Sequence, residues 1–223
     1  MTAVRVYAWL VASDVRQELR RARVVVSAPV LGVLLVLLLG LALGAPDRLS
    51  ADWSAGLLWM MVFFMNAVTA RQTHTRDGEL GARDALQMLP VDRSVIFYAR
   101  WTTATLFLWW AQAVTIGAFF LFLHPSPPGR PLGFIAVQAM GGACMSGISG
   151  LLVTVFASSV LREVLLPLAL FPLAVPLFLA LTRLSAAMLA GNPWPSVWLD
   201  VVLGYLILFG ALPWLVYETL LEV

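Results

Sequence analysis

The sequence predicts an all-α integral membrane protein. Hydrophobic residues make up 61% of the 223-residue chain and charged residues only 12%, and the mean hydropathy is +0.90, which lies far outside the range of soluble globular domains. A bilayer core about 30 Å thick is crossed by roughly 20 apolar residues in a helix, and six runs approach that length. Because the alternating pattern of membrane β-strands is absent from the sequence, a barrel is disfavoured. We therefore expect six transmembrane helices preceded by one amphipathic helix.

The segment before the first span, residues 1–23, is predicted to be an amphipathic helix at the membrane surface. Its apolar side chains recur at helical spacing while four arginines take the opposite face. The apolar set is Val4, Tyr7, Ala8, Val11, Val15, Leu19 and Ala22. Glu18 falls on this apolar side, where an unpaired carboxylate would be costly. It is predicted to pair with Arg21 three residues on, or to contact another protein.

The rest of the chain, residues 24–223, is predicted to form a transmembrane domain of six spans. The apolar runs cover residues 24–44, 54–70, 98–123, 132–157, 164–182 and 197–217. In the fifth run Pro167, Pro172 and Pro176 each remove a backbone donor, so we expect a kinked or broken helix there.

The fourth run is rich in small residues. Gly142, Ser146 and Gly150 recur every four residues, a spacing that allows close helix approach in lipid. The run is not a phosphate-binding loop, because the chain has no lysine and therefore no Walker motif. A lone cysteine, Cys144, excludes an intrachain disulfide and a multi-cysteine metal site. No catalytic motif stands out, so we expect neither enzyme activity nor a bound metal in this chain.

The arginines predict the orientation in the membrane. All 14 basic residues are arginine; five precede the first span and five lie between Arg71 and Arg100. By the positive-inside rule both of these segments are cytoplasmic, which, with six spans, places both chain termini on the cytoplasmic side of the membrane. The net charge of only +2 gives no reason to expect nucleic-acid binding.

The charged segment 71–97 is the candidate site of coupling to a soluble partner. The second span is expected to continue as a helix through Gln72 and His74, followed by two carboxylates, a turn glycine and a short helix over 82–89 that a proline stops. A short helix held between two spans is suited to transmit a push from a cytoplasmic protein. The candidate coupling residues are Asp77, Glu79, Leu80, Gly81, Asp84, Leu86, Pro90 and Arg93.

The span interiors argue against a self-powered carrier. Their centres offer only Asn66, Gln112, Gln138 and hydroxyls, whereas ion-driven transporters carry ionisable side chains there. With no Walker motif of its own, the chain would need a separate ATPase. His124, at the outer end of the third span, is either a tolerated surface residue or a haem contact, since imidazole can ligate haem iron.

The order of these elements resembles an ABC-2 type permease. More narrowly, Asp77-x-Glu79-x-Gly81-x-x-Asp84-x-Leu86-x-x-x-Pro90-Val91-Asp92-Arg93-Ser94 is similar to the haem exporter protein B (CcmB) family of cytochrome c maturation, with support from Gln17-Glu18-Leu19-Arg20 before the first span. The resemblance implies a permease subunit in a membrane complex with a CcmA-like ATPase, CcmC- and CcmD-like proteins and a second copy of itself. In this complex of the bacterial inner membrane, ATP would bind the ATPase. Its hydrolysis would be linked to haem export, with haem as the substrate, or to release of haem from a chaperone on the outer face.

Two other functions stay open at the level of sequence. One is an ABC-2 permease for a lipid or glycan. The other is a mechanical coupler that translocates nothing and passes the energy of ATP hydrolysis to neighbouring membrane proteins. The aliphatic span interiors favour the coupler, because a polar substrate would need polar groups on the wall of its path.

Overall fold

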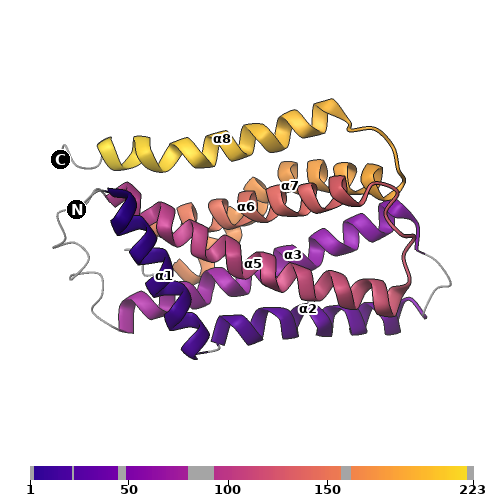
Figure 1. Ribbon diagram of the computed structural model, residues 1–223, viewed down its shortest axis with the longest axis horizontal. Coiled ribbons are helices and arrows are strands. Elements are labelled where there is room, and N and C mark those ends of the chain that lie inside the picture. Colours follow the sequence, from indigo (N-terminus) through magenta and orange to yellow (C-terminus); the bar gives the residue numbers. More distant parts are fainter. Residues whose placement is uncertain (1–2, 22, 45–48, 80–92, 157–161, 220–223) are drawn as a thin grey trace.

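The computed structural model describes residues 3–21, 23–44, 49–79, 93–156 and 162–219, which contain helices and no strand. The predicted all-α fold is confirmed. The helices are α1 (Ala3–Arg21), α2 (Arg23–Ala42), α3 (Ala51–Glu79), α5 (Arg93–Leu123), α6 (Pro131–Val155), α7 (Arg162–Leu189) and α8 (Ser196–Thr219). Figure 1 shows α2 to α8 running along the long axis of the molecule, with α1 crossing obliquely over α5.

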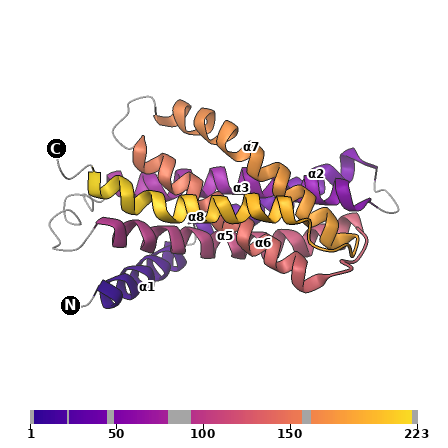
Figure 2. The same ribbon diagram turned by 90° about the horizontal axis from the view of Figure 1, so that it is seen from above.

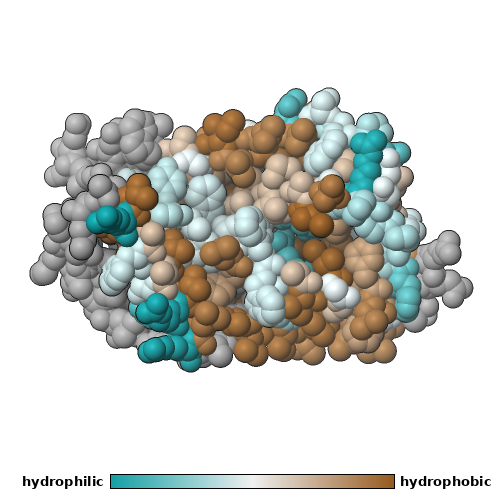
Figure 3. Space-filling view, viewed as in Figure 1, coloured by the Kyte–Doolittle hydropathy of each residue, from teal (hydrophilic) through white to brown (hydrophobic). Residues whose placement is uncertain are grey.

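Five of these helices carry an apolar segment long enough to cross a membrane. The segments are Val25–Ala42, Ala51–Ala70, Ser94–Leu123, Pro131–Val155 and Leu168–Leu189. The described apolar part of α8, Ser196–Leu212, is shorter, although the helix itself continues to Thr219. Figure 3 shows hydrophobic surface over the middle of the bundle and hydrophilic patches toward its two ends, as a bilayer requires.

The fifth span was predicted to be kinked or broken; the break is wrong, because α7 is one continuous helix from Arg162 to Leu189. Pro172 and Pro176 are both exposed, and helices in membranes tolerate proline where local adjustments satisfy the freed carbonyl. Figure 2 shows the N-terminal part of α7 leaning away from the remaining helices.

The central helix is α6, which packs against α3, α5, α7 and α8. Its small residues admit tryptophans from neighbouring helices: a Cβ on Gly142 would lie 2.9 Å from Trp109, and one on Gly147 would lie 3.1 Å from Trp101. The two indole N–H groups donate to backbone carbonyls of α6, at 2.9 Å for Trp101 and 3.0 Å for Trp109. The packing role predicted for the fourth span is confirmed.

The connection that leads into α6 is hydrogen-bonded through its backbone to the C-terminal end of α7. The N–H of Gly129 donates to the Leu189 carbonyl at 3.1 Å, and that of Arg130 donates to the Met188 carbonyl at 3.0 Å. These bonds satisfy carbonyls that a helix C-terminus leaves free. A Cβ on Gly129 would lie 2.6 Å from the Cα of Gly191, so the contact requires glycine at position 129.

Candidate functional site

The polar end of α3 carries the first of the predicted coupling residues. The helix continues as far as Glu79, nine residues past the apolar segment that ends at Ala70. The sequence predicts this extension through His74, and the helix runs five residues further. Asp77 and Glu79 are therefore held on helical backbone that is continuous with a membrane-spanning segment. Arg93 is the first residue of α5, where the chain enters the bundle again.

The remaining coupling residues lie outside the described part of the chain. These are Leu80, Gly81, Asp84, Leu86 and Pro90, together with the short helix predicted over 82–89. Figure 1 places the end of α3, the start of α5, the start of α1 and the end of α8 at the same end of the bundle. That arrangement agrees with the prediction that both ends of the chain and the coupling segment lie on the same side of the membrane.

One face of helix α1 packs against α5. The sequence pattern alone does not distinguish this face from the rest of the apolar side of α1. The hydroxyls of Tyr7 and Thr102 are 2.6 Å apart, and Leu10 and Glu18 are only 8% and 6% exposed. Tyr7 and Glu18 share a face, because eleven residues make three helical turns.

A second apolar side of α1 faces outward. Val4 is 76% exposed and Leu19 is 59% exposed, and the exposed Arg16 and Arg20 follow next around the helix. An exposed apolar strip beside basic side chains is typical of a helix that lies in the membrane interface.

The burial of Glu18 bears on its predicted contact with another protein. The residue is only 6% exposed, so little of it is accessible to another protein in this structure. The alternative partner, Arg21, ends α1, and its side chain is outside the described part of the structure. The contact stays a prediction.

His124 follows α5 directly, is exposed, and has a positive φ of 44°. Its side chain is therefore presented at the end of the bundle rather than between helices. Within the described residues there is no group of three His, Cys, Asp or Glu side chains that could hold a metal ion. A haem contact at His124 stays a prediction.

Neutral polar side chains cross the core between α3, α5 and α6. Asn66 donates to the hydroxyl of Ser149 at 2.6 Å and to the carbonyl of Met145 at 3.2 Å. By contrast, Gln112 and Gln138 are 3% and 5% exposed, and neither side-chain nitrogen finds an acceptor in the described structure. Among the described residues that are buried, Glu18 is the one charged side chain. Because Glu18 belongs to α1, the buried polar side chains of the described helices α2 to α8 are all neutral.

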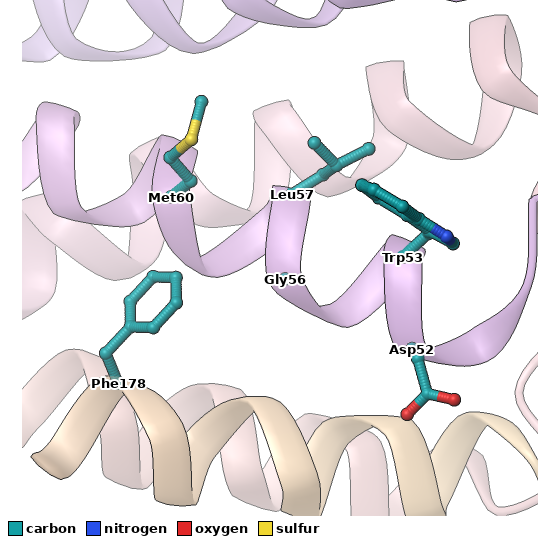
Figure 4. Close-up of a pocket in the computed structure, with 6 residues that line it drawn as sticks. All are labelled: Asp52, Trp53, Gly56, Leu57, Met60 and Phe178. Atoms are coloured by element: carbon teal, nitrogen blue, oxygen red, sulfur yellow. The ribbon is translucent and has the colours of Figure 1, made fainter. Parts of the chain in front are cut away.

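A surface groove of about 390 Å³ runs between α3 and α7. Its lining residues are Asp52, Trp53, Gly56, Leu57, Met60 and Phe178. Figure 4 shows Asp52 and Trp53 at one end, Met60 and Phe178 at the other, and Gly56 between them. Because Gly56 has no side chain and its nearest neighbour would be 4.0 Å from an added Cβ, the middle of the groove stays open.

Sequence reasoning missed this groove. Its walls come from helices far apart in the chain, and its opening depends on the missing side chain of one glycine. Asp52 in the first turn of α3 was the one available signal, since a carboxylate beside an apolar span marks a membrane edge.

The fold and the site together define a polytopic α-helical membrane protein. Its second membrane-spanning helix, α3, has a polar end that extends beyond the apolar segment. A family model described as CcmB protein matches residues 5–213, from α1 into α8 and across the whole predicted coupling segment. The chain therefore belongs to the CcmB family, whose members are membrane permease components of haem export in cytochrome c maturation. The comparisons with curated proteins and with solved structures found no match.

Proposed function

We propose that this chain couples ATP hydrolysis on a separate, CcmA-like ATPase to movement of its own helices during haem export. The observation that carries the proposal is the polar end of α3. Nine helical residues beyond Ala70 extend roughly 13 Å at 1.5 Å per residue, which is enough to reach past the lipid head groups. A partner that pushes on this end would move α3 as a lever.

The packing of α3 supports transmission into the bundle. The helix contacts α2, α5, α6 and α7, and the buried Asn66 bonds it to α6. Buried hydrogen bonds between membrane helices contribute about 0.6 to 2 kcal/mol each. The bonds of Asn66 therefore oppose sliding of α3 along α6. Displacement of the polar end would be passed to α6, the central helix.

Copurification tests the ATPase partnership. The tagged chain, extracted with its native membrane partners, is expected to bring down an ABC ATPase together with CcmC- and CcmD-like proteins. A double charge reversal, Asp77→Arg with Glu79→Arg, should release the ATPase. The matched control, Asp200→Arg near the start of α8, should retain it because that residue lies at the opposite end of the bundle. Equal recovery of the ATPase with the reversed variant would contradict the proposal.

A second candidate function is that of a coupler that moves no haem itself. It is favoured by the charge-free core: the buried polar residues of the described spans are all neutral, although haem carries anionic propionates that would need polar partners along a path. ATP-dependent transfer of haem into sealed vesicles containing the purified complex would exclude this alternative. Loss of transfer on His124→Ala would place haem at the outer end of α5.

A further inference from the structure

The groove between α3 and α7 has two chemically different ends. Its middle and far end are apolar, formed by Leu57, Met60 and Phe178. Its near end carries the exposed carboxylate of Asp52 and the indole of Trp53, which is 66% exposed. An occupant must therefore be an amphiphile with an apolar tail and a head group that tolerates a negative neighbour.

We propose that this groove binds one acyl chain of a phospholipid whose head group carries a primary ammonium. The ammonium lies between the carboxylate of Asp52 and the face of Trp53, and the chain runs past Gly56 toward Phe178. The ammonium offers three donors to the carboxylate, and an aromatic face within about 6 Å attracts a cation.

The dimensions of the groove fit one leaflet. From Asp52 to Met60 the helix advances eight residues, or about 12 Å, while one leaflet contributes roughly half of the 30 Å hydrocarbon core. Tryptophan is enriched at the depth of the lipid head groups, which is where the exposed Trp53 at the start of α3 would place the ammonium.

The charge at the near end distinguishes this occupant from other amphiphiles. Haem and anionic phospholipids would bring negative groups toward Asp52, where like charges repel. The start of α3 is already capped by Ser50, whose hydroxyl accepts a hydrogen bond from the backbone N–H of Trp53 at 3.5 Å. Asp52 is therefore not needed as the cap. The favourable position of a carboxylate at a helix N-terminus accounts for Asp52 itself, but not for the apolar groove that continues from it.

Native mass spectrometry of the full-length chain in detergent tests the assignment. The chain is titrated with phosphatidylethanolamine, phosphatidylcholine and phosphatidylglycerol that carry identical acyl chains. We expect retained phosphatidylethanolamine adducts to exceed those of the other two lipids about threefold, and Asp52→Asn to remove this preference, as for an exposed ion pair. Gly56→Leu should abolish the adduct, since the new side chain fills the groove.

Two matched controls keep the test specific. Asp200→Asn changes another exposed carboxylate, and Gly204→Leu enlarges a glycine that also faces open space; both should bind the lipid like the unmodified chain. Equal adducts for all three lipids, or adducts unchanged by both Asp52→Asn and Gly56→Leu, would overturn the proposal. So would a dimer that Gly56→Leu dissociates while lipid adducts persist, because the groove would then be covered by a second copy of the chain.

Discussion

Asn66 of α3 donates to the hydroxyl of Ser149 of α6 at 2.6 Å, in a site where both residues are 2% exposed. The bond lies on the same helix as the polar end at Glu79 and so connects the predicted coupling residues to the middle of the bundle. Since Ser149 also donates to the Met145 carbonyl and Asn66 donates to that carbonyl as well, the three groups form a closed local network. Such a network fixes the register of α3 against α6.

Replacing Asn66 should destabilise this joint. For Asn66→Leu we expect a loss of about 1 kcal/mol in the free energy of unfolding, the scale measured for polar contacts between membrane helices. Denaturation in mixed micelles, followed by circular dichroism, measures the change. The stimulation of the ATPase by the chain should be reduced more than the stability is, because movement of α3 would no longer be transmitted to α6. A variant as active and as stable as the unmodified chain would contradict the role given to this bond.

The opposite result is expected at Gln138. Both polar atoms of its side chain are buried and unpartnered in the described structure, and replacing an unsatisfied group by an apolar one of similar size removes a desolvation cost of about 1 to 3 kcal/mol. Gln138→Leu should therefore leave the unfolding free energy unchanged or raise it. A decrease of more than about 1 kcal/mol would show that the amide has a partner, such as ordered water.

The hydrogen-bonded connection at the end of α7 requires glycine. Gly129→Ala should lower the thermal midpoint by several degrees, an effect of about 1 to 3 kcal/mol, because the added Cβ would lie 2.6 Å from backbone of Gly191. Gly117→Ala is the control: no atom lies within 4 Å of a Cβ there, and alanine suits a helix better than glycine. Similar midpoints for the two variants would count against the contact.

The docking of α1 depends on the bond between Tyr7 and Thr102. Tyr7→Phe removes the hydroxyl and should weaken docking by about 1 kcal/mol. The measurement is hydrogen exchange of the α1 amides, which should quicken severalfold while exchange in α6 stays as it was. Trp9→Phe provides the control, because Trp9 is 66% exposed. Unchanged exchange in the Tyr7 variant would mean that apolar burial alone holds α1.

Much of the architecture could be predicted from the sequence, because membrane spans depend on length and hydropathy and these are local properties. The helix of the second span was predicted to extend through His74, and α3 continues it to Glu79. The two faces of α1 could not be separated, since a helical pattern shows which residues share a side but not whether protein or lipid covers it. The sequence could not decide between a kink and a break in α7 for a related reason: it does not show that Pro172 and Pro176 are exposed.

The coupling role of the candidate site stays a prediction. Asp77 and Glu79 lie on α3 itself rather than after its end, Arg93 begins α5, and the family match includes all three. The groove and the unpartnered glutamines could not be anticipated, because each depends on the way distant helices meet. Gly56 has the same local sequence character as a glycine that packs tightly, and only the spacing of α3 and α7 keeps its surroundings open.

Nucleotide-dependent crosslinking at the end of α3 is the most direct test of whether a separate ATPase acts on this end of the helix. Cysteine at position 79 or 86 is combined with cysteines along the cleft of the ATPase, and the native Cys144 does not interfere because it is buried. Ser126, exposed at the opposite end of the bundle, serves as the control position. We expect a crosslink from position 79 or 86 whose yield changes when ATP is bound, and no such crosslink from position 126. No nucleotide-sensitive crosslink at any position from 77 to 89 would contradict it.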